Sequence, residues 1–322
     1  MTTTQPTHTF HPQLTERHEA FKKKPGDSIT AADFEPFAAP YGPYEEWELT
    51  IEDRKIPGPS EAQIPVRVYT PDWQSASPRP CLVWMHGGGW VAGDLDMPEG
   101  HETARGVAGR ADAVVVSVDY RLCGEGVRFP APHEDVLAAY RWVRDNATSL
   151  GVDPTRIALG GASAGANLAA GASLYLRDAG ETPWQALLIY PLVHAPLPEP
   201  SEELTAALAK LPFPFDKLTG GLDQVFSGYL GDVPLTEASP YAFPGLAEDL
   251  SGFPPTYIDN DEFDPLRASG ELFTDQLRAA GVDVEQALSP GVVHGHLNLV
   301  GLDTAHATLD RMAARLRQGG RA

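Results

Sequence analysis

The sequence predicts an α/β fold in which a mainly parallel sheet of eight strands carries helices on both faces. Several short apolar runs lack alternation, which is typical of strands covered on both faces. Helical patterns separate the later runs. A glycine-rich pentapeptide also stands at the turn between one apolar run and the helical pattern that follows it. This regular alternation of strands and helices favours a doubly wound sheet.

Eight segments carry the strand signal. They are Trp47–Arg54, Ile64–Thr70, Cys81–His86, Ala113–Asp119, Arg156–Leu159, Gln185–Tyr190, Thr256–Ile258 and Val284–Leu288. The first two have only a short connection between them, so we expect them to form an antiparallel edge. The helical patterns cover Pro132–Asn146, Ser163–Asp178, Pro265–Ala280 and Gly301–Leu316. Gly281 is placed to end the third of these helices.

Two regions do not fit the alternation. Residues 1–44 are rich in polar residues, prolines and phenylalanines, and residues from about 195 to 240 hold several prolines around short helical patches. They could be ordinary surface excursions. We expect instead one domain spanning residues 1–322, with a small cap built from these two regions that shapes a substrate pocket.

The composition narrows the class of protein. Of 322 residues, 42% are apolar and 21% are charged, which is ordinary for a soluble globular protein. The net charge of −20 argues against nucleic acid or an anionic membrane as a partner. No apolar run reaches the roughly 18–20 residues that cross a bilayer, and no secretory signal is visible. Because Cys81 and Cys123 are the sole cysteines, we expect a reduced, cytoplasmic location.

Two glycine motifs follow predicted strands and carry the chemistry. The first is His86-Gly87-Gly88-Gly89-Trp90, and the second is Gly161-Ala162-Ser163-Ala164-Gly165. The second has the G-x-S-x-G form that holds a serine on a sharp turn with its hydroxyl exposed. Glycines in the first let backbone N–H groups approach a ligand atom closely. A nucleophile and oxyanion donors together indicate a serine hydrolase, although Ser163 read alone could be a helix N-cap.

A serine nucleophile requires a base and an acid that orients the base. In hydrolases with this elbow, the acid and then the histidine follow the serine in the chain. Asp264 and His294 each follow a predicted strand, at the sheet edge where such folds bind ligands. Asp261 is the alternative acid, and His296 is the alternative base.

The motifs taken together resemble the hormone-sensitive-lipase family of α/β-hydrolase esterases, from about Val66 to Gly301. The matching segments are His86-Gly87-Gly88-Gly89-Trp90, Val118-Asp119-Tyr120-Arg121-Leu122, Phe129-Pro130-Ala131, Glu134-Asp135, Gly161-Ala162-Ser163-Ala164-Gly165, Tyr190-Pro191, Asp264-Pro265-Leu266 and His294-Gly295. The resemblance implies that Ser163 is the nucleophile, His294 the general base and acid, and Asp264 the orienting carboxylate. It also implies an oxyanion hole made of the N–H groups of Gly88, Gly89 and Ala164.

The chain departs from the family pattern at several places. Ala162 stands where the family often has an aspartate, and Cys123-Gly124-Glu125 replaces a usual Ala-Pro-Glu. His296 stands where an aromatic residue often follows His-Gly, so we expect it to widen or polarise the pocket wall. The other expected pocket residues are Trp90, Phe213 and Phe215, although Trp90 could simply pack in the core.

Further polar residues have structural interpretations. We expect His86 to hold the glycine loop by hydrogen bonds and Asp119 to form an ion pair with Arg121. The histidines of His18-Glu19 and His101-Glu102 lack a second histidine at metalloprotease spacing. Residues 160–165 lack the middle glycine of a dinucleotide loop. We therefore predict neither a metal nor a cofactor.

The expected function is a carboxylesterase that hydrolyses small or short-acyl esters through an acyl-enzyme. One alternative is an amide hydrolase similar to kynurenine formamidases, which carry a motif comparable to His86–Trp90. Another is a non-catalytic receptor of small molecules, similar to the gibberellin receptors, although those lose the base that His294 supplies here. The expected partner is a small-molecule ester, and the resemblance implies a homodimer through the last strand.

Overall fold

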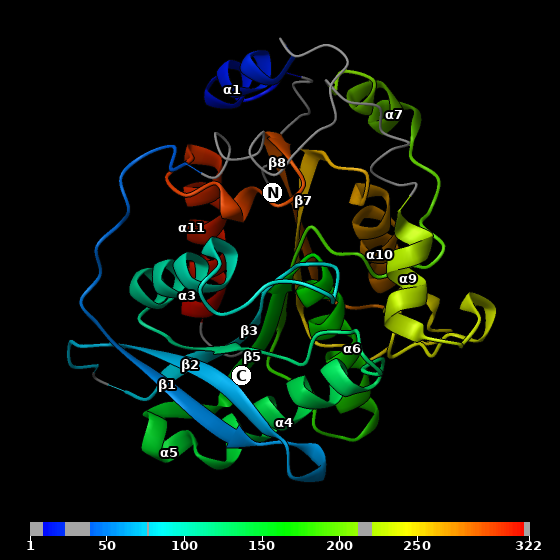
Figure 1. The fold of residues 1–322 in the computed structure, drawn as a ribbon. Coiled ribbons are helices and arrows are strands. Elements are labelled where there is room, and N and C mark those ends of the chain that lie inside the picture. Colours follow the sequence, from blue (N-terminus) through cyan, green and yellow to red (C-terminus); the bar gives the residue numbers. More distant parts are fainter. Residues whose placement is uncertain (1–8, 23–38, 76, 212–220, 319–322) are drawn as a thin grey trace.

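The eight predicted strands form one sheet in the computed structural model, which describes residues 9–22, 39–75, 77–211 and 221–318 (Figure 1). The strands are β1 (Leu49–Pro57), β2 (Gln63–Pro71), β3 (Arg79–Met85), β4 (Val114–Val118), β5 (Val152–Ala162), β6 (Ala186–Ile189), β7 (Thr256–Phe263) and β8 (Val284–Val293). Their order in the sheet is β1-β2-β4-β3-β5-β6-β7-β8. As predicted, β1 and β2 form an antiparallel edge, and the strands from β4 to β8 run parallel to one another.

The four predicted helices are present within a few residues of their expected bounds. They are α4 (Ala131–Asp145), α6 (Ala164–Asp178), α10 (Arg267–Ala279) and α11 (Asp303–Arg317). A further long helix, α3 (Pro98–Ala111), was not predicted. Three glycines lower its helix propensity and obscure its apolar period. Shorter helices are α1 (Pro12–Lys22), α5 (Ala147–Leu150), α7 (Glu202–Leu208) and α9 (Leu222–Leu230), with single turns at Pro59–Glu61, Leu235–Glu237, Pro244–Leu246 and His296–Asn298.

Each face of the sheet has its own apolar core. On β3, Leu82 and Trp84 pack with α3 and α11, whereas Val83 and Met85 pack with α4, α6 and α10 on the other face (Figure 1). Alternate side chains enter different cores, and both cores exclude water. This is why the strand reads as an unbroken apolar run in the sequence.

Both cysteines lie in the interior. Cys81 on β3 and Cys123 are buried free thiols. Burial raises the pKa of the Cys81 thiol and raises the pKa of Cys123 to about 11. None of the described helices combines the length and the apolar character that crossing a bilayer requires.

Parts of the two regions predicted to form a cap contact the carboxyl end of the sheet. The ring of Phe10 stacks on Phe263 with centroids 4.2 Å apart, and the N–H of His11 donates to the carbonyl of Gly291 at 2.8 Å. Val225 of α9 lies over the glycine loop, because a Cβ atom built on Gly89 would be 3.6 Å from Val225 Cγ1. The expected cap of residues 1–44 and about 195–240 stays a prediction. Phe213 and Phe215 lie outside the described residues.

Candidate active site

Five parallel strands deliver polar residues to one edge of the sheet. Ser163 directly follows β5, Asp264 follows β7, and His294 follows β8. His86 follows β3 and Tyr190 follows β6 in the same way. Because parallel strands share the direction of their carboxyl ends, all of these residues emerge together, where open α/β sheets bind ligands.

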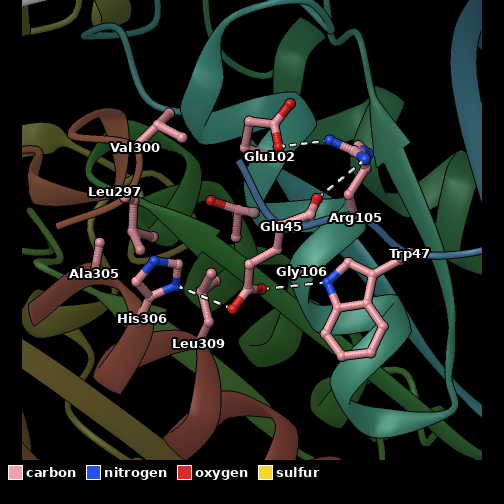
Figure 2. A pocket seen from close by; sticks show the side chains of 12 residues that line it. Glu45, Trp47, Glu102, Arg105, Gly106, Leu297, Val300, Ala305, His306 and Leu309 are labelled. Carbon is pink, nitrogen blue, oxygen red and sulfur yellow. Dashed lines mark hydrogen bonds and ion pairs between the residues drawn. The ribbon is translucent and has the colours of Figure 1, made fainter. Parts of the chain in front are cut away.

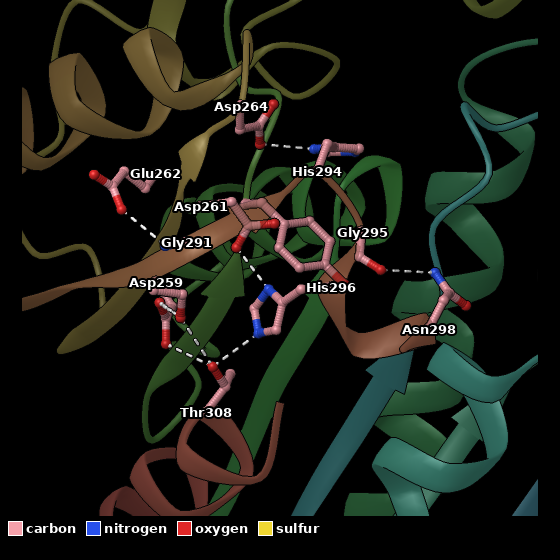
Figure 3. A network of polar contacts seen from close by, with 12 residues as sticks. Asp259, Asp261, Glu262, Asp264, Gly291, His294, Gly295, His296, Asn298 and Thr308 are labelled. Atoms are coloured by element: carbon pink, nitrogen blue, oxygen red, sulfur yellow. Dashed lines mark hydrogen bonds and ion pairs between the residues drawn. The ribbon is translucent and has the colours of Figure 1, made fainter. Parts of the chain in front are cut away.

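The structure brings Ser163, His294 and Asp264 into contact. His294 Nε2 lies 2.9 Å from Ser163 Oγ. His294 Nδ1 lies 2.7 Å from Asp264 Oδ2 (Figure 3). Asp264 is fully buried, and its other oxygen accepts the N–H of Leu266 at 2.8 Å. This backbone bond fixes the carboxylate, and the carboxylate in turn fixes the imidazole against the serine hydroxyl.

Ser163 sits on a strained turn between β5 and α6. Its φ of 55° and ψ of −119° fall in a region that residues with side chains rarely occupy. The flanking glycines make the turn feasible, since a Cβ atom on Gly161 would be 2.3 Å from Gly165 O and one on Gly165 would be 2.2 Å from Met85 O. The Ser163 side chain makes no capping hydrogen bond, so the alternative reading as a plain N-cap is wrong.

The glycine loop after β3 presents backbone donors beside Ser163. Gly88 and Gly89 have φ values of 114° and 60°, and a Cβ atom on Gly88 would be 2.0 Å from the carbonyl oxygen of Ala92. In the described part of the chain, the N–H groups of Gly88, Gly89 and Ala164 donate to no protein acceptor. His86 Nδ1 lies 2.7 Å from the carbonyl oxygen of Gly87, which confirms its expected role in holding the loop.

A buried glutamate behind the loop was missed by the sequence reasoning. The Glu99 carboxylate accepts hydrogen bonds from the Gly87 N–H, from the Tyr190 hydroxyl at 2.6 Å and from the Asn298 amide at 3.2 Å. The Tyr190 ring in turn lies edge-on to His294, with centroids 5.0 Å apart. Glu99 lies in the first turn of α3. Because that helix was not predicted, the sequence reasoning did not consider an acid at its start.

Charges around His294 favour its protonated form. Burial lowers the pKa of His294, but the charge and hydrogen bond of Asp264, with the charges of Asp261 and Glu99, outweigh this effect. The net result raises the pKa to about 9. A base with this environment accepts a proton readily, although it must be neutral before it can do so.

The two alternative residues, Asp261 and His296, pair with each other. His296 Nδ1 lies 2.6 Å from Asp261 Oδ1, and His296 Nε2 lies 2.9 Å from Thr308 Oγ1 (Figure 3). Neither residue contacts Ser163. The expectation that His296 lines the pocket is therefore wrong: the ring is fully buried and turns inward because Asp261 and Thr308 engage both of its nitrogens.

Two other expectations need correction or refinement. Arg121 does not pair with Asp119; it forms a two-pronged ion pair with the buried Asp135, at 2.8 Å. Trp90 is fully buried and stacks on Tyr229 of α9, with centroids 4.2 Å apart and planes within 5° of parallel. Trp90 thus joins the glycine loop to α9, which is the packing role.

A shallow hollow lies away from the triad, between α3 and α11 (Figure 2). Apolar parts of Trp47, Leu297 and Leu309 line it. Its charged groups are paired, Glu45 with His306 and Glu102 with Arg105. The hollow therefore presents mainly apolar surface. Within the described residues, no cluster of histidine, cysteine or acidic side chains has an arrangement that suits a metal ion.

Comparison with known proteins agrees with this geometry. Residues 82–298 match a family described as having an alpha/beta hydrolase fold. The chain is 41% identical over 276 residues to carboxylesterase NlhH of Mycobacterium tuberculosis, covering 84% of this chain and 83% of that protein. It is 32% identical over 240 residues to ethyl acetate hydrolase of Pseudomonas putida, covering 73% and 72% of the two chains.

A solved esterase structure has the same fold as this chain. The structure described as a hyperthermophilic esterase from the archaeon Pyrobaculum calidifontis superposes with a TM-score of 0.78 and 33% identity, covering 96% of this chain and 98% of that one. The family match spans more than half of the residues, and the strands from β4 to β8, the serine turn and the glycine loop lie within it. The chain therefore belongs to the α/β-hydrolase fold family, as a member of its hormone-sensitive-lipase group of carboxylesterases.

Proposed function

We propose that this chain is a serine carboxylesterase that hydrolyses small or short-acyl esters through Ser163, His294 and Asp264. The carrying observation is the continuous hydrogen-bonded line from Ser163 Oγ through His294 to Asp264, with contacts of 2.9 and 2.7 Å. These distances allow direct proton transfer between the serine and the base.

In the acylation step, Ser163 Oγ attacks the ester carbonyl carbon while His294 Nε2 takes the hydroxyl proton. The carbonyl oxygen becomes an oxyanion, which accepts hydrogen bonds from the N–H groups of Gly88, Gly89 and Ala164. Ala164 is the first residue of α6, so the helix dipole also favours negative charge there. Each such donor contributes about 10²–10³ in rate in comparable enzymes.

Acylation is completed when His294 passes its proton to the leaving alcohol oxygen as the carbon–oxygen bond breaks, leaving an acyl group on Ser163. Water then attacks this acyl-enzyme and gives a proton to His294. The tetrahedral intermediate collapses, the carboxylic acid leaves, and the proton returns to Ser163 Oγ. Asp264 holds the imidazole in one orientation throughout.

The preference for short acyl chains has two supports. The relative from Pseudomonas putida is named for ethyl acetate, an ester with a two-carbon acyl group. In this chain, α9 lies directly over the glycine loop, with Val225 near Gly89 and Tyr229 stacked on Trp90. We infer that this packing limits the space available to an acyl chain near the oxyanion donors.

The test is hydrolysis of p-nitrophenyl esters from acetate to dodecanoate by the wild type and by Ser163→Ala. We expect a rate that peaks at short chains and is lost in Ser163→Ala. Ser173→Ala is the matched control, because Ser173 is a buried serine of the same helix α6. Retained activity in folded Ser163→Ala would refute the nucleophile, and a peak at long chains would refute the short-acyl preference.

N-formylkynurenine as a further substrate separates ester from amide hydrolysis. The proposal expects its turnover to be slower than that of p-nitrophenyl acetate. The reverse order would favour the amide hydrolase. Binding of small acids without turnover of any substrate would favour the receptor.

A further inference from the structure

A second carboxylate–imidazole pair lies beside Asp264 and His294, formed by Asp261 on β7 and His296 in the turn after β8. Asp261 lies three residues before Asp264, and His296 lies two residues after His294. Asp261 and His296 are both fully buried, and their contact of 2.6 Å is as short as that of the first pair. A buried pair of this kind is costly to form and is weak evidence for stability alone, so its position suggests a role.

Tyr190 connects the two pairs. Its ring lies edge-on to His294 with centroids 5.0 Å apart and edge-on to His296 with centroids 5.4 Å apart. Both imidazoles therefore pack on one fixed ring, whose hydroxyl is held by Glu99 at 2.6 Å. The buried pair lies within one side-chain layer of the proposed base.

The charge on Asp261 has little compensation. The neighbouring Asp259 is neutralised by Arg311, at 2.7 Å, and by hydrogen bonds from Tyr257 and Ser289. Among the described residues, the Asp261 carboxylate hydrogen-bonds to the imidazole of His296 through one oxygen, and its second oxygen has no hydrogen-bond partner there. Its field is thus free to act on neighbouring groups, and in a buried site that effect is stronger than in water.

Several charged and titratable groups face the pair from the surrounding elements. They are Asp259 and Tyr257 on β7, Asp264 at its end, His294 after β8, Arg311 on α11, Tyr190 after β6 and Glu99 on α3. Arg311 is the cation of this set, and it is already paired with Asp259. The strongest remaining opposite charge near Asp261 is the imidazolium that His294 becomes during the reaction.

We propose that Asp261 and His296 are positioning residues for the proposed base: the Nδ1–H of His296 donates a hydrogen bond that keeps Asp261 ionised, and Asp261 stabilises the imidazolium form of His294. The inference rests on the proposed function, since it acts through His294. Thr308 fixes the other nitrogen of His296 at 2.9 Å, which holds the donor aimed at Asp261.

The titration behaviour of the two groups agrees with this arrangement. Burial raises the pKa of Asp261 to about 6, against the opposing effect of His296. The carboxylate is therefore charged over the alkaline range in which His294 titrates. Asp261 is also one of the charges that raise the pKa of His294.

The first test is the pH dependence of kcat/KM for Asp261→Asn, which keeps the shape of the side chain and removes its charge. We expect the rising limb to move to lower pH by about one unit, because one stabilising charge near His294 is lost. His296→Phe should move it in the same direction, since a buried carboxylate without its partner takes up a proton. If the two residues act as a unit, the double variant should shift no further than either single variant.

Ser289→Ala is the matched control. The Ser289 hydroxyl contacts Thr308 at 3.1 Å and Asp259 at 2.8 Å in the same buried network. The backbone of Ser289 pairs with Asp261 across β7 and β8, but its hydroxyl makes no hydrogen bond to the Asp261 or His296 side chain, so the substitution leaves that pair intact. We expect a lower Tm and an unmoved pH limb. An unmoved limb in folded Asp261→Asn would overturn the proposal, and so would an equal shift in Ser289→Ala.

Two further measurements keep the result decisive. If His294→Ala retains activity, the proposed function fails; if it is inactive while the Asp261 and His296 variants keep the wild-type limb, only the present inference fails. Should those variants not fold, ¹⁵N NMR of the wild-type histidines replaces them. The proposal requires a proton on His296 Nδ1 throughout the titration of His294, and an unprotonated Nδ1 overturns it.

Discussion

The hydroxyl of Tyr190 donates to Glu99 at 2.6 Å, and through this contact one buried carboxylate holds both halves of the site. The same carboxylate accepts the N–H of Gly87 in the oxyanion loop, while the Tyr190 ring packs against His294. A single side chain therefore links the loop of the oxyanion donors to the ring that packs on the base.

Glu99→Ala should lower kcat more than it raises KM. The change leaves the Gly87 N–H and the Tyr190 hydroxyl buried without a partner, at a cost of about 1–3 kcal/mol for each group. We expect kcat for p-nitrophenyl acetate to fall by about ten- to a hundredfold, in line with a misplaced catalytic group, and Tm to fall as well. The kcat of Glu99→Gln should lie between those of the wild type and Glu99→Ala, because the amide oxygen can still accept one hydrogen bond.

The matched control for Glu99 is Glu102→Gln in the same helix. Glu102 pairs with Arg105 at 2.8 Å on the partly exposed side of α3 and is remote from the triad. Its kcat should equal that of the wild type. An unchanged kcat in Glu99→Ala would mean that the loop and the base are held by other contacts.

The pH dependence of kcat/KM should rise into the alkaline range. The neutral form of His294 is the active base, and its pKa is raised to about 9 from an ordinary value of 6.5. The neutral fraction therefore grows as pH increases, and half of the maximal rate is expected at about pH 9. Initial rates with a substrate whose product signal is independent of pH measure this profile. A half-maximal kcat/KM near pH 6.5 would contradict the prediction.

Asp264→Asn should both slow the reaction and move this limb. Loss of the carboxylate removes the largest stabilising influence on the imidazolium, so the limb shifts to lower pH. The rate at the plateau should fall by about 10⁴, as when a triad aspartate is replaced elsewhere. A small loss with an unmoved limb would show that another acid orients the base.

The stability of the folded chain should decline over the same pH range. A histidine whose pKa is raised on folding contributes stability that is complete below its unfolded pKa of about 6.5 and is lost as pH rises through its folded value. Tm should thus fall as pH approaches 9. The fall should be smaller in His294→Ala, measured by thermal unfolding at matched ionic strength; identical curves would contradict the link.

Two glycine substitutions separate steric blockage from backbone strain in the oxyanion loop. Gly88→Ala places a Cβ atom 2.0 Å from the Ala92 carbonyl oxygen at a φ of 114°, so the loop must move. We expect activity to fall by about 10²–10³, comparable to the loss of an oxyanion donor. In Gly89→Ala the new Cβ atom meets nothing closer than Val225 Cγ1 at 3.6 Å, and the only cost is the strain of a φ of 60°. The loss of activity should therefore be smaller than in Gly88→Ala. Equal losses would show that loop displacement does not decide the rate.

The strands were predictable because local apolar runs determine them, and the place of the triad then followed from the parallel sheet. A Cβ atom on Gly161 would meet Gly165 within the serine turn, and one on Gly165 would meet Met85 of the neighbouring β3, so the turn requires both glycines. Parallel strands then bring Asp264 and His294 to the same edge as Ser163. The identity of the acid and of the base could not be decided from the residues alone, since Asp261 and His296 stand close by. In the structure these two residues contact each other, which excludes them as the acid and base that act on Ser163.

The failures share a physical cause: each concerns a buried side chain whose partner is identified by no motif. Asp135 is 14 residues from Arg121, and Gly87 is 12 residues from Glu99. Neither pairing has a sequence spacing that reveals it. The direction of the His296 side chain likewise depends on Thr308 and Asp261, which come from two other elements.

The burial of both native thiols makes this protein convenient for site-specific labelling. A thiol reacts as its thiolate, and the raised pKa values of Cys81 and Cys123 keep that form scarce at neutral pH. A cysteine introduced at Gln224, an exposed position of α9, would react with a maleimide dye while the two native cysteines are labelled little. Because Tyr229 of the same helix stacks on Trp90, the fluorescence of such a dye would report any change in the contact between α9 and the glycine loop.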